Sequence, residues 1–468
     1  MDRSTIAAIA TPAGTGGVGI IKISGPEAIR TTADIFSPGP PGNCPPDRFD
    51  PEWSSNSWRF HYGRIVDPDS GRMVDEVLLA IMRAPRSYTC EDVVEIQAHA
   101  GTAVLKAIMD LLTARGIRLA EPGEFTRRAF LNGRIDLTQA EAVIDMINAR
   151  SDAAREMAAS QMAGALGSEI TRIRAVLSDS LAEVEALIDF PEAVDDEIDS
   201  ARLSAGLSSA ICRPIAELIA RHDAEDVLRS GHRVVIAGGP NVGKSSLMNR
   251  LVGSERTIVS DLPGTTRDFI EATFFARGIP VILADTAGLR SDPEPLEKLG
   301  IEKTREYIEA ADIILYVMDA GSPVSAEDLE MIDAIAGKRA ILVINKIDLP
   351  REIRRCRIPG RWEGIRRVEI SALYQTGLDL LTGAIADLAG NFSSGHSDRL
   401  VPNMRHRSLL DRAFQSVNGA IKGLEEGLSA EFISIDLRSA HDALCEITGE
   451  KIAPDLLDRI FDRYCIGK

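Results

Sequence analysis

The sequence predicts a multidomain protein in which a doubly wound α/β domain is inserted into an all-α domain, with an N-terminal α+β domain ahead of both. Three observations predict this fold class. The chain has 468 residues, which is too long for one hydrophobic core. The segment "GGPNVGKS" at residues 238–245 follows a buried-type strand and opens an apolar helix, as a phosphate-binding loop requires. Helical periodicity stands on both sides of this α/β region.

Residues 1–130 are expected to form the N-terminal domain. The runs "TIAAIA", "GIIKIS", "EVLLAIM" and "DVVEIQAHA" predict strands, and the Pro-rich insert "SPGPPGNCPPDRFDPE" predicts a surface loop. The run "GTGGVG" at residues 14–19 matches the letters of a dinucleotide-binding fingerprint. A strand pattern follows it, however, where that fingerprint needs a helix. We therefore predict a glycine-rich hairpin there rather than a phosphate loop.

Residues 131–227 are expected to form the first part of the helical domain, and residues 392–468 the second part. No proline occurs from residue 138 to 190, and apolar residues recur there at helical spacing. The segment "TQAE" at residues 138–141 predicts a capping box, and Pro191 predicts the end of the helical run. The second part ends in "CIGK".

Residues 228–391 alternate strand and helix patterns and are expected to form a Ras-like G domain. In the phosphate-binding loop, Lys244 can reach the β- and γ-phosphates and the Ser245 hydroxyl can bind Mg²⁺. After the apolar run "AILVI", the motif "NKID" supplies Asp348, which can accept two hydrogen bonds from guanine but none of that kind from adenine. With "DTAG" at residues 285–288 and "SAL" at 371–373, this order of motifs predicts a GTP hydrolase.

The composition of the chain limits which classes of protein it can belong to. No apolar run approaches the roughly 20 residues of a membrane span, and the start lacks the pattern of a signal peptide, so we expect a cytoplasmic protein without a membrane partner. The six cysteines form no C-x-x-C pair, which favours reduced thiols. A net charge of −17 argues against broad nucleic-acid binding but leaves room for a local basic patch. Residues 351–367 carry seven arginines, which fit either a solvated face or a contact to tRNA or a partner.

The hydrolytic step needs a group that the local sequence does not identify. Ras-like enzymes place a water-orienting glutamine directly after "DTAG", and this chain has Leu289 there. A leucine side chain cannot orient water. The group must come from elsewhere, through a conformational change or a partner, and no acid in the following charged segment stands out.

The whole chain, apart from the Pro-rich insert, resembles the MnmE (TrmE) family of tRNA-modification GTPases of bacteria and organelles. The resemblance rests on the inserted G domain, on "GGPNVGKSS", "SDLPGTTRD" and "DTAGLR", on "FTRRAFLNGRIDLTQAEAV" and on the final "CIGK". It implies that Glu297 positions the attacking water, which would resolve the problem posed by Leu289. It further implies Mg²⁺ on Ser245 and Thr266, and K⁺ on Asn241, Ser260, Leu262 and Thr265.

The catalytic candidates are Glu297, Lys244 and Cys465. A lone C-terminal cysteine is usually an incidental thiol, and the resemblance raises its importance without settling its role. The positions expected to bind GTP are Asn241, Val242, Gly243, Lys244, Ser245, Ser246, Ser260, Asp261, Leu262, Pro263, Gly264, Thr265, Thr266, Asp285, Thr286, Ala287, Gly288, Asn345, Lys346, Asp348, Ser371 and Ala372.

The resemblance also implies that the N-terminal domain binds a tetrahydrofolate derivative, in the 5,10-methylene or 5-formyl form, near a dimer interface. The matching positions are Lys22, Glu95, Arg134 and Lys468. Lys22 stands where the family usually has arginine, and Arg134 stands where lysine also occurs. The positive charge is kept at both positions, but bidentate hydrogen bonding to a carboxylate is not guaranteed.

The function implied is a K⁺-stimulated GTPase that helps to install a carboxymethylaminomethyl- or aminomethyl-type group at carbon 5 of the wobble uridine (U34) of certain tRNAs. The resemblance implies a homodimer that assembles with a flavoprotein of the MnmG (GidA) type into a heterotetramer, with FAD and NADH on that partner only. Two alternatives stay open: a ribosome-assembly GTPase, and a folate-binding or membrane-scaffolding GTPase switch without enzymatic modification activity. The absence of a basic amphipathic helix disfavours the membrane version.

Overall fold

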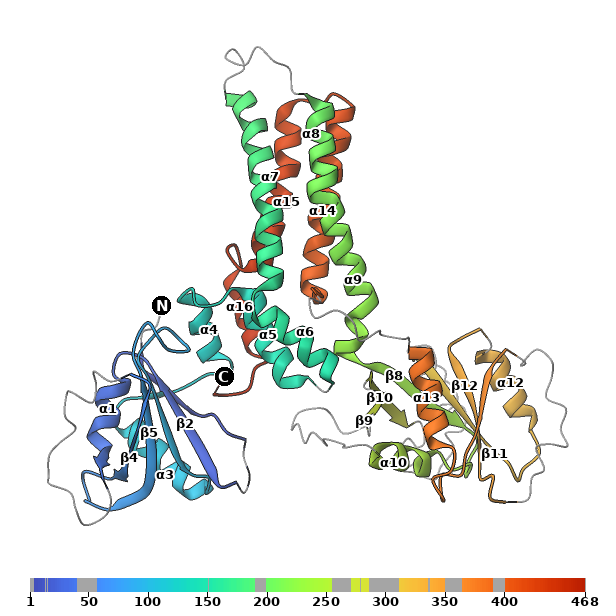
Figure 1. Ribbon diagram of the computed structural model, residues 1–468, viewed down its shortest axis with the longest axis horizontal. Coiled ribbons are helices and arrows are strands. Elements are labelled where there is room, and N and C mark those ends of the chain that lie inside the picture. Colours follow the sequence, from blue (N-terminus) through green and yellow to red (C-terminus); the bar gives the residue numbers. More distant parts are fainter. Residues whose placement is uncertain are drawn as a thin grey trace, which may run out of the picture. The chain divides into compact units, whose positions relative to one another are not determined.

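The computed structural model describes residues 4–12, 14, 16–39, 57–149, 151–189, 199–254, 271–277, 279–285, 311–335, 337–349, 364–389 and 400–467. The chain divides into two compact units. One consists of Met1–Ile144, Gln161–Glu217 and Met404–Lys468, and the other of Asp145–Ser160 and Leu218–Asn403. The labels in Figure 1 follow the elements of both units along the chain.

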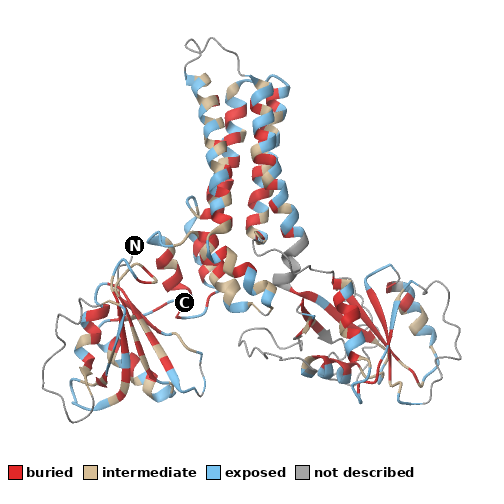
Figure 2. Ribbon diagram, in the orientation of Figure 1, coloured by how far each residue is buried: buried red, intermediate tan, exposed pale blue. Residues whose placement is uncertain are grey.

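The N-terminal part of the first unit is a seven-stranded sheet in the order β3-β4-β5-β6-β2-β1-β7. Its strands are β1 (Ile6–Ile9), β2 (Val18–Ser24), β3 (Phe36–Pro38), β4 (Arg59–Val66), β5 (Met73–Met82), β6 (Val93–His99) and β7 (Arg118–Leu119). Helices α1 (Ala28–Ile35) and α3 (Thr102–Ala114) share one apolar core with this sheet. Buried residues therefore run through the middle strands in Figure 2.

The four predicted N-terminal strands are confirmed as β1, β2, β5 and β6, but β4 was not predicted. Its side chains Phe60 and Tyr62 are exposed, by 62% and 45%, so the strand lacks the polar-outside alternation that marks a half-buried strand. The predicted glycine-rich hairpin is also confirmed, because β1 and β2 pair antiparallel and the "GTGGVG" run enters strand β2. The dinucleotide-binding fold is thus excluded at this loop.

The helical part of the first unit is built from segments far apart in the sequence. Its described helices are α4 (Glu124–Leu131), α7 (Ala165–Asp189), α8 (Ser200–Leu207), a π-helical turn (Ser208–Cys212), α14 (Met404–Glu425), α15 (Ala430–Thr448) and α16 (Pro454–Phe461). It also contains the first parts of α5 (Leu137–Asn148) and α9 (Arg213–Ser230), both of which continue into the second unit. Helix α15 packs against α7 and α14, and α8 packs against α14 (Figure 1). The buried stripes on these helices repeat at the spacing that the sequence predicted.

One described helical stretch, Ser200–Asp223, is long enough to cross a membrane and contains an 18-residue window with a mean hydropathy of 1.2. A single stretch of this kind is weak evidence for a span, because the core helices of bundles have the same composition. Its first part, α8, packs against α7 and α14 of the bundle.

The start of α5 differs from the prediction. The capping box lies at Asp136 and Gln139 instead of residues 138–141: Gln139 N donates to Asp136 Oδ1 at 2.8 Å, and Asp136 N donates to Gln139 Oε1 at 2.9 Å. Glu141, which was expected to close the box, is instead bound to Arg405 and His406 of α14. A long-range ion pair therefore takes the carboxylate that local sequence assigned to the cap.

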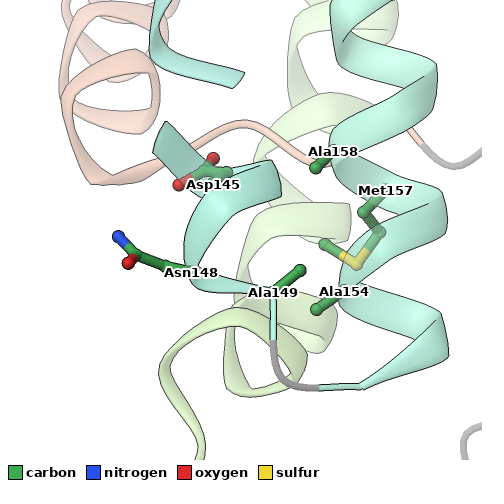
Figure 3. A pocket seen from close by; sticks show the side chains of 6 residues that line it. All are labelled: Asp145, Asn148, Ala149, Ala154, Met157 and Ala158. Carbon is green, nitrogen blue, oxygen red and sulfur yellow. The ribbon is translucent and has the colours of Figure 1, made fainter. Parts of the chain in front are cut away.

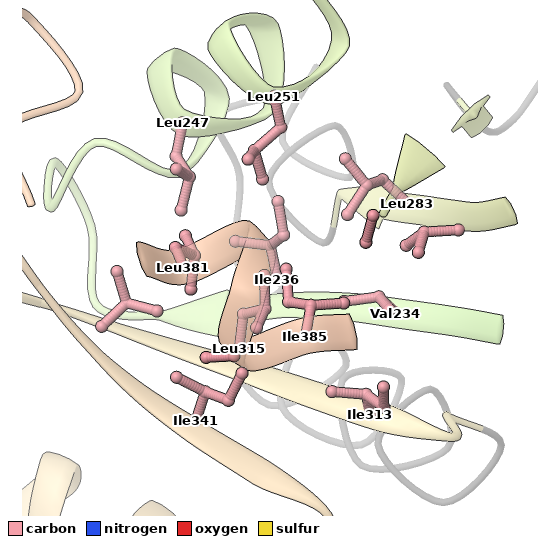
Figure 4. Packing of buried hydrophobic residues seen from close by; sticks show 14 of the residues in the cluster. Val234, Ile236, Leu247, Leu251, Leu283, Ile313, Leu315, Ile341, Leu381 and Ile385 are labelled. Carbon is pink, nitrogen blue, oxygen red and sulfur yellow. The ribbon is translucent and has the colours of Figure 1, made fainter. Parts of the chain in front are cut away.

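The second unit contains the G domain, a six-stranded sheet in the order β13-β12-β11-β8-β10-β9. The strands are β8 (His232–Gly238), β9 (Glu271–Ala276), β10 (Ile279–Asp285), β11 (Ile313–Asp319), β12 (Ala340–Asn345) and β13 (Arg366–Glu369), and only β9 pairs antiparallel among them. Helices α10 (Lys244–Ser254) and α13 (Leu378–Ala389) cover one face of the sheet, around the core drawn in Figure 4. Helix α12 (Ala326–Ile335) belongs to the core on the other face. The predicted doubly wound fold is confirmed.

Two buried histidines join the segments through which the chain enters and leaves this sheet. His232 begins β8, and its Nε2 lies 3.0 Å from the carbonyl oxygen of Ala389 at the end of α13. His222, on α9 (Arg213–Ser230), has its Nδ1 2.7 Å from the carbonyl oxygen of Pro402. In each pair the ring nitrogen donates, because a carbonyl oxygen only accepts. The incoming and outgoing segments are thus bonded to each other twice.

The second unit also holds a small cavity of about 40 Å³, lined by residues of α5, α6 (Asp152–Met162) and the connection between them. Figure 3 shows the side chains that line it, including Asp145, Asn148 and Met157. The volume suits one or two water molecules but no nucleotide or folate, and the cavity is no candidate for the functional site.

Candidate functional site

Strand β8 runs into the phosphate-binding loop, which ends at the start of α10. The loop depends on its glycines. Gly238 has a φ of +147°, and a Cβ there would lie 2.2 Å from the carbonyl oxygen of Val317. Gly243 has a φ of +98°, and a Cβ there would lie 2.4 Å from the side chain of Asn345. Both positions therefore exclude other residue types, as expected for a backbone that curls tightly around phosphate oxygens.

The loop holds Lys244 inside its curve. The Nζ atom donates to the carbonyl oxygens of Gly238 at 3.0 Å and Gly239 at 2.7 Å, and the residue is buried. Asn241, at the turn of the loop, has a left-handed φ of 59°. In P-loop enzymes the lysine at this position of the loop contacts the β- and γ-phosphates.

A cavity of about 550 Å³ lies beside the loop and joins three of the predicted motifs. Its lining residues are Gly243, Ser246, Asn249, Arg250, Asn345, Lys346, Asp348, Leu349, Ala372 and Leu373. The volume falls within the range of small-molecule and cofactor sites. The sequence did not single out Asn249, Arg250 or Leu349, because these residues stand outside the motif letters; the helical spacing of Asn249 and Arg250 from Ser246 was the available signal.

Hydrogen bonds connect the "NKID" segment to both of the other motifs. Asn345 Nδ2 donates to the carbonyl oxygen of Val242 at 2.9 Å, and Ala372 N donates to Asn345 Oδ1 at 3.0 Å. Lys346 Nζ donates to the carbonyl oxygen of Asn241 and to Asp319 Oδ2, each at 2.7 Å. Because the three motifs are hydrogen-bonded to one another, a substitution in one of them is expected to alter the geometry of the other two.

Asp348 is oriented by Ser371, whose hydroxyl donates to Asp348 Oδ1 at 2.6 Å. An ionised carboxylate has about four acceptor positions, so this bond leaves capacity for two further donors. The N1 and N2 hydrogens of guanine are such a pair. The exposed side chains of Leu349 and Leu373, which also line the cavity, add an apolar surface for the faces of a base.

The other predicted G-domain positions are only partly within the described residues. Asp285 ends β10 and pairs in register with Ile236 of β8, so the "DTAG" motif begins at the same sheet edge as the phosphate-binding loop. Outside the described residues lie Ser260, Asp261, Leu262, Pro263, Gly264, Thr265, Thr266, Thr286, Ala287, Gly288 and Glu297.

Three of the predicted folate-binding residues lie within the described part of the first unit, and the structure brings them together. Lys22 on β2 and Glu95 on β6 are cross-strand partners, with Lys22 Nζ 3.8 Å from Glu95 Oε1. Arg134 Cζ lies 4.8 Å from the ring centroid of Tyr88, and Lys22 Nζ lies 5.4 Å from the same centroid. Sequence reasoning missed Tyr88, since a single aromatic residue in a turn-rich segment has no periodicity to mark it.

The C-terminal tail lies against the hairpin that carries Lys22. A Cβ at Gly467 would lie 2.8 Å from the carbonyl oxygen of Ile9, so only glycine allows this approach. Cys465 is exposed, and its carbonyl oxygen accepts a bond from Gly123 N at 3.5 Å. Lys468 is outside the described residues.

Two protein-family models match this chain, one over its N-terminal domain and one over the rest. A model described as the MnmE helical domain matches residues 137–465, and one described as the GTP-binding protein TrmE N-terminus matches residues 5–134. A protein of Geobacter sulfurreducens named tRNA modification GTPase MnmE is 45% identical over 471 residues, covering 100% of this chain and 99% of its own. A protein of the same name from Desulforamulus reducens is 42% identical over 470 residues, covering 99% of each chain.

The chain belongs to the MnmE family of tRNA modification GTPases.

The MnmE helical model spans the inserted G domain and ends at Cys465. Among solved structures, the G domain of the T. maritima FeoB iron transporter is 26% identical and has a TM-score of 0.26; the match covers 34% of this chain and 98% of that one. Membership in the MnmE family thus rests on the full-length relatives and the family models.

Proposed function

We propose that this protein is a K⁺-stimulated GTP hydrolase that, with a flavoprotein partner of the MnmG type, installs a carboxymethylaminomethyl- or aminomethyl-type group at carbon 5 of the wobble uridine of certain tRNAs. The observation that carries the proposal is the cavity that unites the phosphate-binding loop, "NKID" and "SAL" in a member of the MnmE family. GTP hydrolysis would gate a conformational cycle, since the phosphate site and the folate candidates lie in different compact units.

The proposed metal ligands have the chemistry that each ion prefers. Mg²⁺ would be held by the hydroxyls of Ser245 and Thr266, and hydroxyl oxygens suit this hard cation. K⁺ would be held by Asn241, Ser260, Leu262 and Thr265, and would offset charge on the β- and γ-oxygens. Of the four proposed K⁺ ligands, Asn241 lies within the described residues. Its backbone has a left-handed φ, and its carbonyl oxygen accepts a hydrogen bond from Lys346, which supports a fixed position for this ligand. Glu297 is proposed to position the attacking water.

For the N-terminal domain we propose binding of a tetrahydrofolate derivative, which would supply the one-carbon group. The residues fit such a ligand. Glu95 can accept hydrogen bonds from the amino and ring N–H groups of a pterin, Lys22 lies 3.8 Å from Glu95 beside the same part of the ligand, and a cation such as Arg134 suits the carboxylates of the glutamate tail. Lys468 is proposed as a third cation. Cys465 is exposed and remains a catalytic candidate.

The assembly proposed is a homodimer through residues 1–130, joined by the flavoprotein into a heterotetramer in the cytoplasm. The partner would hold FAD and NADH and supply the redox chemistry. We further propose the domain boundaries 1–130, 131–227, 228–391 and 392–468, with the two helical segments flanking the G domain.

The proposed function is tested first by mass spectrometry of tRNA nucleosides from cells with and without the gene. We expect the deletion strain to lose carbon-5 aminomethyl-type wobble uridines, and the loss to be reversed by the wild-type gene but not by a Lys244→Ala version. An unchanged nucleoside profile would remove the tRNA-modification role while leaving the GTPase intact.

The hydrolytic mechanism is tested by GTP turnover in KCl and in NaCl. Wild-type protein is expected to turn over about tenfold or more faster in KCl, because K⁺ adds charge stabilisation at the transferring phosphate. Asn241→Ala should abolish this difference between the salts. Glu297→Ala should bind GTP with unchanged affinity and hydrolyse it slowly in both salts. Equal wild-type rates in both salts would rule out the K⁺ site, and a fully active Glu297→Ala protein would rule out Glu297.

A further inference from the structure

Lys346 of "NKID" connects the base-recognition motif to the turn of the phosphate-binding loop. Its Nζ atom donates to the carbonyl oxygen of Asn241 and to Asp319 Oδ2, each at 2.7 Å. Asp319 ends β11, and its register partner in β12 is Asn345, the residue directly before Lys346. The lysine therefore bridges the end of one strand of the sheet and the loop that follows β8.

The carboxylate of Asp319 is fixed by a second contact. Its Oδ1 atom accepts a hydrogen bond from Gly321 N at 2.8 Å, so each carboxylate oxygen has a donor. The Asp319 side chain is 16% exposed and that of Lys346 is 32% exposed, and charges at this depth are less screened by salt than surface charges. Among the described residues, Lys346 lines the nucleotide cavity and Asp319 does not. A substitution of Asp319 can therefore alter the bridge without removing a residue that lines the cavity.

The bridge joins two residues whose backbones adopt the left-handed region. Asn241 has a φ of 59° and Lys346 has a φ of 62°. Residues other than glycine keep this conformation where surrounding contacts hold them. The bond from Lys346 to the Asn241 carbonyl oxygen is such a contact. Because the carbonyl group and the side chain share one Cα atom, a shift of this turn would also move the Asn241 side chain that is proposed to bind K⁺.

The charge of Lys346 matters to the same site. Its ammonium lies 2.7 Å from the carbonyl oxygen of a proposed K⁺ ligand, and a positive charge this near opposes the binding of a cation. Asp319 places a carboxylate 2.7 Å from the same ammonium. This ion pair offsets the lysine charge and leaves the bond to Asn241 in place.

We propose that Asp319 is a positioning residue for the K⁺ site and acts through Lys346. It fixes the turn of the phosphate-binding loop at Asn241 and offsets the lysine charge that would otherwise oppose K⁺. This inference rests on the proposed role of K⁺. It predicts that loss of the Asp319 charge weakens K⁺ binding and leaves nucleotide binding without K⁺ nearly unchanged.

The first measurement is the K⁺ concentration that gives half-maximal GTP turnover, with NaCl keeping the ionic strength constant. Asp319→Asn keeps the size of the side chain and one acceptor oxygen but removes the charge. It should raise this concentration about tenfold, with kcat at saturating K⁺ within about twofold of wild type. Asp319→Glu keeps the charge and should need less K⁺ than Asp319→Asn. Asp379→Asn, at an exposed carboxylate in the first turn of α13, changes the net charge equally and should behave as wild type.

The second measurement does not depend on hydrolysis. The melting temperature of the protein with a bound non-hydrolysable GTP analogue is followed as KCl replaces NaCl, because a bound ion stabilises the folded state. Asp319→Asn should need about tenfold more K⁺ than wild type for the same rise in melting temperature. Its affinity for GDP, measured in NaCl without K⁺, should stay within about threefold of wild type, which also shows that the variant is folded.

The outcomes that would contradict the proposal are distinguishable. No response of the wild-type protein to K⁺ in either measurement would overturn the K⁺ site, and the role of Asp319 with it. An unchanged K⁺ requirement in Asp319→Asn would overturn the role of Asp319 while the K⁺ site stands. An equal loss of GDP affinity in NaCl would show that Asp319 supports the whole nucleotide cavity and has no specific effect on the K⁺ site. A K⁺ requirement of Asp319→Glu as high as that of Asp319→Asn would rule out the offset of the lysine charge.

Discussion

Replacement of Asp348 by asparagine is expected to lower the affinity for GTP by about 10²- to 10⁴-fold and to create binding of xanthosine triphosphate. The Asp348 carboxylate lines the nucleotide cavity and is oriented by Ser371 at 2.6 Å. It can accept from both guanine N1–H and the N2 amino group. An asparagine presents one acceptor and one N–H₂ group, and the latter would face the guanine amino group, donor against donor. Xanthine has a carbonyl oxygen at that position and would restore both bonds.

Competition binding with a fluorescent guanine nucleotide measures this change. Ser371→Ala is the matched control, because it removes the orienting hydrogen bond but keeps the carboxylate, and should weaken GTP binding only about tenfold. GTP affinity that is unchanged in Asp348→Asn would show that the base does not bind at this carboxylate. Equal losses of GTP and xanthosine triphosphate would indicate damage to the cavity instead of altered recognition.

Replacement of Glu141 by glutamine is expected to destabilise the protein by about 3 kcal/mol at pH 7. Arg405 Nε and Nη2 donate to the two carboxylate oxygens at 2.8 Å each, and His406 Nε2 lies 2.6 Å from Oε2. His406 is fully buried. Burial alone would raise the pKa of Glu141, but the charge of His406 and the hydrogen bonds of Arg405 outweigh it and hold the pKa well below its usual range. A neutral amide would leave these buried groups without their counter-charge.

The same pair predicts a pH dependence. Because the folded-state pKa of Glu141 is depressed, its stabilisation is fully present above the unfolded-state value of about 4.5 and is lost as pH falls below it. The difference in free energy of unfolding between wild type and Glu141→Gln should therefore shrink as the pH falls below about 4.5, measured by urea denaturation. Glu169→Gln, in an exposed pair with Arg172, is the control and should cost less than about 0.5 kcal/mol. A difference of the same size at pH 7 and in acid would contradict the charge-based account.

The sequence predicted those parts of the candidate site that consist of residues adjacent to one another in the chain. The phosphate-binding loop and "NKID" are short segments whose backbone and side chains act where the chain places them, and both were located by their motifs and flanking strands. The fold class followed from periodicity in the same way. The pairing of Glu141 with Arg405 could not be predicted, because 264 residues separate them and no local pattern records such a contact. The position of Tyr88 beside Lys22 and Arg134 could not be predicted for the same reason, since these two residues come from other segments.

The insertion of the G domain between two halves of a bundle has a consequence for synthesis on the ribosome. Glu185 of α7 is bonded to Arg438 of α15, which follows 253 residues later. At ribosomal speed this interval is on the order of tens of seconds, during which α7 has been made but its partner helix has not. The G-domain sheet, whose strands lie entirely within that interval, can fold first. During that interval the apolar stripe of α7, with Leu177 and Val184, lacks its α15 partner, so we expect newly made chains of this protein to expose that stripe until α15 has been synthesised.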